Sequence, residues 1–137
     1  MTIHAVIDTN VLVSSMLTKN RNAATARLVD ALIDNKFRPV YNKDIIEEYA
    51  EVLRRAEFNF DIDAVEGIID VIRGNGLYAD RTPTNDSVID PEDIALAKKS
   101  AYLVTGNLKH FPKKPIVVTP AEMITILEDN GLIEKEK

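Results

Sequence analysis

Short apolar runs alternate along the chain with longer segments that have helical periodicity. The apolar runs have the length and composition of strands covered on both faces, as parallel strands usually are. The first of them ends in Asp8-Thr9-Asn10, which predicts a polar turn at the end of a buried strand. The four predicted strands span residues 3–7, 38–41, 102–105 and 116–118.

The longer segments place their apolar residues on one side of a helix. Asn35 follows the first of them and is a candidate helix stop. Thr119-Pro120-Ala121-Glu122 has the form of a capping box with proline at the first helical position, and it predicts a further helix start. The amphipathic segments span residues 23–33, 43–55 and 64–72.

This alternation predicts an α/β fold with a mainly parallel sheet, right-handed crossovers and helices on both faces. Ligands bind such sheets beyond the carboxyl ends of the strands, which is the position of Asp8. The 137 residues contain no internal repeat and no linker. We therefore expect a single domain over residues 1–137, with a frayed tail from about residue 133.

The composition excludes several classes of protein and of active site. At 45% hydrophobic and 28% charged residues, it is typical of a soluble globular protein. The absence of cysteine excludes disulfides, zinc–thiolate sites and thiol nucleophiles, and it fits a reducing cytoplasm. No apolar run approaches the roughly 18 residues of a membrane span, and the first residues lack the layout of a signal peptide. A cytoplasmic protein without a membrane partner is predicted.

The charge distribution leaves two interpretations open. A net charge of -5 argues against a simple nucleic-acid binder. The segment from Lys98 to Lys114, however, contains five lysines and His110 but no acid. It is either a phosphate-binding surface or a solvated face rich in lysine. The five lysines are Lys98, Lys99, Lys109, Lys113 and Lys114.

With no cysteine and two histidines, the candidate catalysts are carboxylates. Asp8, Thr9 and Asn10 put three oxygen-bearing side chains on one turn, although Asp8 could equally be a helix N-cap. On a helical projection of residues 43–55, the apolar side is centred at about 40°. Glu47 then falls at about 200° and Glu48 at about 300°. Glu47 therefore faces water. Glu48 lies beside the buried face, as a site residue or as an ordinary boundary glutamate.

A third group of polar residues follows later in the chain. Asp90-Pro91-Glu92-Asp93 has the form of a helix start, so capping accounts for Asp90. Asp93 is less well explained by capping, although the helix dipole favours an acid in the first turn. Gly106 permits a tight turn that would aim Thr105 and Asn107 at the same rim.

Carboxylates that converge are unfavourable without compensation, which a divalent cation can supply. Two unit charges 4 Å apart repel by about 1 kcal/mol in water and by roughly 4 kcal/mol at an effective dielectric of 20. Ligands that are all oxygen select hard ions such as Mg²⁺ or Mn²⁺ rather than zinc. Such ions activate water and stabilise a phosphodiester during displacement, which is nuclease chemistry. A phosphatase of the haloacid dehalogenase type is excluded, because Asn10 stands where that chemistry needs a second aspartate.

The motifs resemble those of the PIN-domain family. Val6-Ile7-Asp8-Thr9-Asn10-Val11-Leu12-Val13-Ser14 resembles its opening motif, and residues 45–53, 90–93 and 102–107 resemble its second, third and fourth motifs. Residues 108–112 and 118–120 are similar to those of VapC-like toxins of toxin–antitoxin systems. The resemblance spans nearly the whole chain in order.

The resemblance implies a three-layer α/β/α sandwich and RNA cleavage that depends on Mg²⁺ or Mn²⁺. Asn107 stands where many relatives have an aspartate, so it would offer a metal ion an oxygen without a charge. The implied partners are RNA, a protein antitoxin and a second copy of the chain as a homodimer. By this resemblance the catalytic acids are Asp8, Glu48 and Asp93, further metal ligands are Asp90 and Asn107, and supporting residues are Thr9, Asn10 and Thr105. For contact with RNA phosphates we expect Lys109, His110, Lys113 and Lys114; His110 is either a general acid or a solvated loop histidine.

One segment departs from the expected pattern. Residues 91–100 are short for a crossover between parallel strands, which needs about a dozen residues or more. This predicts a deletion or residues missing between Asp93 and Ile94. Together with Asn107 it indicates an alternative function, a catalytically impaired PIN-like module that binds nucleic acid or protein.

Overall fold

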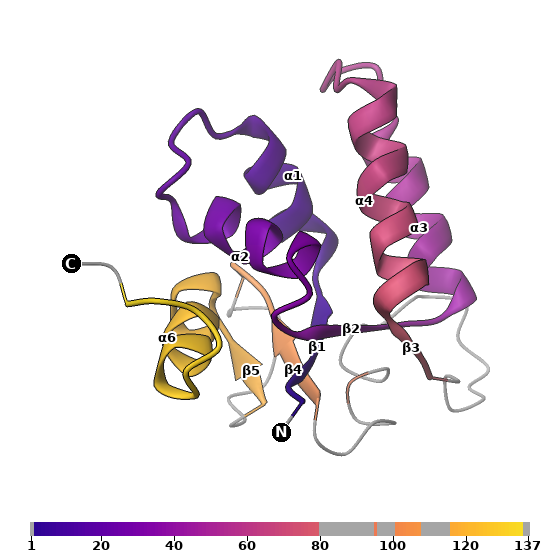
Figure 1. Ribbon diagram of the computed structural model, residues 1–137. Coiled ribbons are helices and arrows are strands. Elements are labelled where there is room, and N and C mark those ends of the chain that lie inside the picture. Colours follow the sequence, from indigo (N-terminus) through magenta and orange to yellow (C-terminus); the bar gives the residue numbers. More distant parts are fainter. Residues whose placement is uncertain (1, 80–94, 96–100, 108–115, 136–137) are drawn as a thin grey trace.

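Five strands form one sheet in which every pair is parallel (Figure 1). The computed structural model describes residues 2–79, 95, 101–107 and 116–135. The strand order is β3-β2-β1-β4-β5, so the first strand of the chain is the central one. The strands are β1 (His4–Ile7), β2 (Arg38–Tyr41), β3 (Leu77–Tyr78), β4 (Ala101–Val104) and β5 (Val117–Val118).

Helices flank this sheet, and the predicted α/β architecture is confirmed. Helix α2 packs against α1 and α6, and α4 packs against α3, α2 and strand β2. No helix in the described part of the chain is long and apolar enough to cross a membrane. In the described residues the helices are α1 (Thr9–Leu17), α2 (Ala24–Ile33), α3 (Lys43–Leu53), α4 (Ile62–Asn75) and α6 (Pro120–Asp129).

The predicted helix ends are confirmed where the sequence carries a specific signal. Asn35 has a φ of 59°, the left-handed conformation that asparagine tolerates at the end of a helix, and it follows α2. Thr119 and Glu122 form the predicted capping box at α6. The Glu122 N–H donates to the Thr119 hydroxyl oxygen at 3.1 Å, and the Thr119 N–H donates to Oε1 of Glu122 at 3.0 Å. The end of α4 was not predicted; at Gly76, which follows it, a Cβ would lie 2.2 Å from the carbonyl oxygen of Ile72, so only glycine fits.

The path of the chain differs from the expected one at two places. Helix α1 begins at Thr9, directly after β1, so Asp8-Thr9-Asn10 is a helix start and not a separate turn. Strand β3 was not predicted, because two residues carry no apolar pattern. Since β3 ends at Tyr78, residues 79–100 are available for the connection to β4 and the argument from a short crossover does not hold. The predicted helix start at Asp90 and the junction between Asp93 and Ile94 lie outside the described residues.

The strand order fixes where a ligand would bind. The chain adds β2 and β3 on one side of β1 and later adds β4 and β5 on the other side. The order therefore reverses between β1 and β4, and open parallel sheets bind their ligands outside the carboxyl ends of the strands at such a point. Asp8 directly follows β1 and Thr105 directly follows β4.

Candidate active site

Asp8 and Thr105 meet at the carboxyl ends of β1 and β4. Ile7 is in register with Val104, and the Asp8 N–H donates to the Val104 carbonyl oxygen at 2.9 Å. The Thr105 hydroxyl, fully buried, donates to Oδ2 of Asp8 at 2.7 Å and accepts the Asn107 N–H at 3.0 Å. The sheet register therefore holds the Asp8 carboxylate against the loop that follows β4.

Thr9, which follows Asp8, contacts Glu48 on α3. Thr9 is buried in the first turn of α1, and its hydroxyl donates to Oε2 of Glu48 at 2.6 Å. Glu48 is half-buried on α3, whereas Glu47 beside it is exposed, as the helical projection predicts. Thr105 and Asp8 form one hydrogen-bonded pair and Thr9 and Glu48 form a second, and the two pairs are linked because Asp8 and Thr9 are adjacent in the chain. We call these four residues the carboxylate cluster.

In the described part of the chain, the side chains that contact the two carboxylates carry hydroxyl groups. Asp8 occupies the N-cap position of α1, but its side chain makes no capping hydrogen bond. Its charge still lies at the positive end of the helix dipole. Among the described residues, no lysine, arginine or histidine forms an ion pair with Asp8 or Glu48, and hydrogen bonds engage only Oδ2 and Oε2. Oδ1 of Asp8 and Oε1 of Glu48 accept no hydrogen bond from the described residues.

Tyr49 lies beneath the carboxylate cluster. Its side chain is 1% exposed, and its hydroxyl donates to the carbonyl oxygen of Ile7, the residue before Asp8. Burial and the negative charges of Asp8 and Glu48 raise the pKa of Tyr49, so the phenol stays neutral and adds no third charge. From the sequence, no role was assigned to Tyr49. The sequence did carry a signal for such a role. A tyrosine at a buried helix position needs a hydrogen-bond partner for its hydroxyl, whereas a phenylalanine there would need none.

The other predicted site residues fall into two groups. Asn107 is half-buried in the loop after β4, and its N–H contacts Thr105. Asn10 is exposed on α1 and no described hydrogen bond joins it to the carboxylate cluster. The described residues contain no group of three or more histidine, aspartate or glutamate residues able to hold a metal ion. The remaining predicted residues lie outside the described ranges: Asp90, Asp93, Lys109, His110, Lys113 and Lys114.

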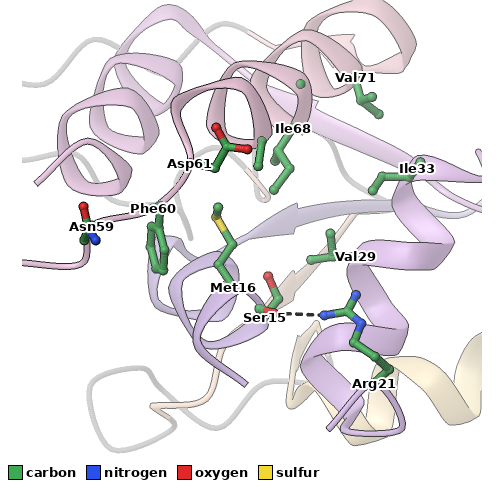
Figure 2. A pocket seen from close by; sticks show the side chains of 12 residues that line it. Ser15, Met16, Arg21, Val29, Ile33, Asn59, Phe60, Asp61, Ile68 and Val71 are labelled. Atoms are coloured by element: carbon green, nitrogen blue, oxygen red, sulfur yellow. Dashed lines mark hydrogen bonds between the residues drawn. The ribbon is translucent and has the colours of Figure 1, made fainter. Parts of the chain in front are cut away.

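A separate apolar groove lies between α1, α2 and α4 (Figure 2). Its volume is about 630 Å³, and Met16, Phe60 and Val71 are among the side chains that line it. Ile33 on its border is 49% exposed. None of the four residues of the carboxylate cluster lines this space.

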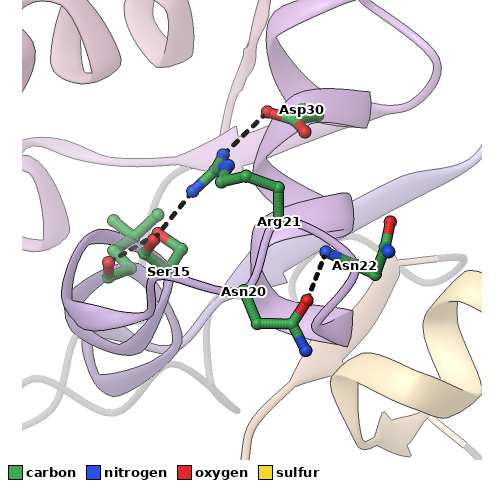
Figure 3. Close-up of polar contacts among 6 residues, drawn as sticks. Ser15, Asn20, Arg21, Asn22 and Asp30 are labelled. Atoms are coloured by element: carbon green, nitrogen blue, oxygen red, sulfur yellow. Dashed lines mark hydrogen bonds and ion pairs between the residues drawn. The ribbon is translucent and has the colours of Figure 1, made fainter.

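Arg21, which lines the apolar groove, makes polar contacts with Ser15 on α1 and Asp30 on α2 (Figure 3). Its guanidinium donates to the Ser15 carbonyl oxygen at 3.3 Å and pairs with Asp30 at 3.1 Å. The loop that carries Arg21 also contains a short internal contact, in which the Asn22 N–H donates to Oδ1 of Asn20 at 3.0 Å. Because Arg21 and Asp30 are both more than half exposed, this pair contributes little to stability and mainly orients the loop.

The fold and the position of the carboxylates define a class of α/β proteins with an acidic site at the end of a parallel sheet. A model of the PIN domain matches residues 4–109, so this chain belongs to the PIN-domain family. PIN domains are typically nucleases, and these nucleases generally use divalent metal ions. No curated protein and no solved structure gave a significant match.

Proposed function

We propose that the chain is a metal-dependent endoribonuclease that hydrolyses the phosphodiester bonds of RNA. The observation that carries this proposal is the position of two carboxylates, Asp8 and Glu48, beyond the central strand, each with one oxygen that accepts a threonine hydroxyl. Two half-buried carboxylates without a cationic partner among the described residues fit a hard divalent cation, Mg²⁺ or Mn²⁺.

The proposed roles follow from the chemistry of the side chains. Asp8, Glu48 and Asp93 are the catalytic acids and metal ligands, with Asp90 and Asn107 as further ligands. A bound cation would supply stabilisation of the charge on the phosphodiester and an activated water for displacement. Thr9 and Thr105 keep the two carboxylates of the carboxylate cluster oriented. The residues proposed to contact RNA phosphates are Lys109, His110, Lys113 and Lys114.

Cleavage of RNA by Asp8→Asn tests the mechanism. With Mg²⁺ or Mn²⁺ present, the wild type is expected to cut RNA and the variant to lose most of this activity, because a neutral amide holds the cation more weakly. Asp34→Asn is the matched control, since Asp34 is exposed at the carboxyl end of α2. Equal activity in Asp8→Asn and wild type would disprove the assigned mechanism.

Metal titration separates the nuclease from a binding module without catalytic activity. A ligand that binds only the native state raises the Tm by mass action. We expect Mn²⁺ to raise the Tm of the wild type and to do so less in Asp8→Asn. A wild type whose Tm responds to neither ion, and which cuts no RNA, would support the catalytically impaired module that Asn107 indicates.

We also propose that the nuclease is the toxin of a toxin–antitoxin pair, with a protein antitoxin as partner. This rests on the similarity of residues 108–112 and 118–120 to that subgroup of PIN domains. Induction of the wild type in a bacterial cell is expected to arrest growth, and induction of Asp8→Asn is not. Coexpression of the neighbouring gene should restore growth if it encodes the antitoxin. Sedimentation of the purified chain tests the proposed homodimer.

A further inference from the structure

Tyr49 connects the two carboxylates of the carboxylate cluster through the backbone. It directly follows Glu48 on α3, and its hydroxyl donates to the carbonyl oxygen of Ile7, which directly precedes Asp8. One buried side chain therefore joins the neighbour of one proposed metal ligand to the neighbour of the other. No other described hydrogen bond joins α3 to the backbone of β1.

The register of the sheet explains why Ile7 needs this donor. The Asp8 N–H points toward β4, where it donates to Val104, so the Ile7 carbonyl of the same peptide points toward the opposite side. On that side the register between β1 and β2 ends at Ala5. The Tyr49 hydroxyl takes the place of a strand partner for Ile7.

We propose that Tyr49 is a positioning residue for the metal site: its hydrogen bond to Ile7 sets the distance between the carboxylates of Asp8 and Glu48. This inference rests on the proposed function, because it assumes that these two side chains bind one cation. A cation with a fixed coordination distance is sensitive to small changes in ligand spacing, and residues that orient ligands are worth about 10- to 100-fold in metal affinity.

The alternative is that Tyr49 only fills the core. Both roles predict that Tyr49→Phe lowers the Tm, because the Ile7 carbonyl loses its donor. Only the positioning role predicts a change in the concentration of Mn²⁺ at half-saturation. This concentration is obtained from the rise of the Tm with added Mn²⁺, which does not depend on activity.

The experiment compares the wild type, Tyr49→Phe and Tyr41→Phe. Tyr41 is a matched control, since its hydroxyl also donates to a backbone carbonyl, that of Arg73 at 3.4 Å, on a different part of the fold. We expect the half-saturating concentration of Mn²⁺ to rise about 10-fold or more in Tyr49→Phe and to stay within about 2-fold of the wild type in Tyr41→Phe. An unchanged value in Tyr49→Phe, even with a lower Tm, overturns the inference.

A second variant covers the case in which Tyr49→Phe does not fold. Replacement of Tyr49 by 4-aminophenylalanine keeps a ring of similar size and an N–H donor near the Ile7 carbonyl. The half-saturating concentration is then expected to stay within about 3-fold of the wild type. A shift of about 10-fold with the donor retained would contradict a role for the hydrogen bond.

The wild-type titration distinguishes failure of this inference from failure of the proposed function. If neither Mn²⁺ nor Mg²⁺ raises the Tm of the wild type and RNA is not cut, both proposals are wrong. If the wild type binds Mn²⁺ and cuts RNA while Tyr49→Phe keeps its affinity for Mn²⁺, the nuclease stands and only the role of Tyr49 is wrong.

Discussion

The carboxylate cluster and the apolar groove are built from opposite kinds of contact. In the carboxylate cluster, hydroxyl groups join residues that are 39 and 97 positions apart in the sequence. The apolar groove is lined mainly by carbon atoms from three helices, and the polar contacts described for its lining side chains include those of Arg21, Ser15 and Asp61. Directional hydrogen bonds fix the first region, whereas shape and burial define the second.

Helix α1 belongs to both regions. Asp8 and Thr9 stand at its amino end, and Ser15 and Met16 near its carboxyl end line the apolar groove. Six to eight positions along α1 separate Asp8 and Thr9 from Ser15 and Met16, so the two regions lie roughly 9–12 Å apart along the helix axis. Substitutions in the carboxylate cluster should therefore change catalysis, and substitutions in the apolar groove should change stability, independently of each other. The predictions below test this separation, from the largest expected effect to the smallest.

Glu48→Gln should have the largest effect. It keeps the size of the side chain but removes a charge that a cation needs, and loss of several kcal/mol of stabilisation corresponds to about a 1,000-fold lower kcat/KM for RNA. Glu47→Gln, one residue earlier on α3 and exposed, should retain the wild-type value. Steady-state cleavage of a fluorescent RNA measures both. Similar losses in the two variants would mean that α3 does not present Glu48 to the reaction.

Ile68→Ala should change stability without changing chemistry. Ile68 lines the apolar groove from α4 and is 8% exposed, so truncation removes buried carbon and leaves a cavity. We expect the free energy of unfolding in urea to fall by about 2–5 kcal/mol. At a temperature where the variant is folded, kcat/KM should equal that of the wild type. A lower kcat/KM would show that the two regions are coupled through the helices.

One hydroxyl in each region allows a closer comparison. Thr105→Val removes the donor to Asp8 without changing the volume much, and kcat/KM should fall about 10- to 100-fold. Ser15→Ala removes a hydroxyl that donates to the Leu12 carbonyl oxygen at 2.6 Å beside the apolar groove. It should cost about 1 kcal/mol of stability and leave kcat/KM unchanged. The separation of the regions fails if Ser15→Ala is as inactive as Thr105→Val.

Ile33→Ser should have the smallest effect. Ile33 is 49% exposed at the border of the apolar groove, so its change to serine exposes little new carbon. The free energy of unfolding is expected to stay within about 0.5 kcal/mol of the wild type, and kcat/KM should not change. Urea unfolding followed by circular dichroism measures the difference. A loss as large as that of Ile68→Ala would show that Ile33 is part of the core.

Most of the fold could be predicted because it depends on local patterns. The four apolar runs became strands with ends displaced by no more than one residue, and Thr119 began α6 as its capping box predicted. Strand β3 could not be predicted, because two residues carry no periodicity and it exists only through its pairing with β2. The sequence left a turn and a helix start at Thr9 both open, because a polar segment after a strand has the same composition in a turn and in a first helical turn.

The candidate site could be predicted in part for a similar reason. The angular position of Glu48 follows from α3 alone, and the half-buried Glu48 beside the exposed Glu47 confirms it. The hydrogen bonds of Thr9 and Thr105 depend on register and helix packing, which no local pattern specifies. The spacing of residues in the sequence did not decide whether Asp8 is a helix N-cap or a site residue. The absence of a side-chain capping bond and the bond from Thr105 favour the site.

The place of β1 has a consequence for synthesis of the protein. This strand leaves the ribosome first among the five, yet its neighbour β4 is made much later. At about 5–20 residues per second, the 97 positions between Asp8 and Thr105 take roughly 5–20 s to translate. Until then the Asp8 carboxylate lacks its hydroxyl donor and its strand partner. If the chain cuts RNA as proposed, its own messenger is read past β4 before the nuclease exists to attack it.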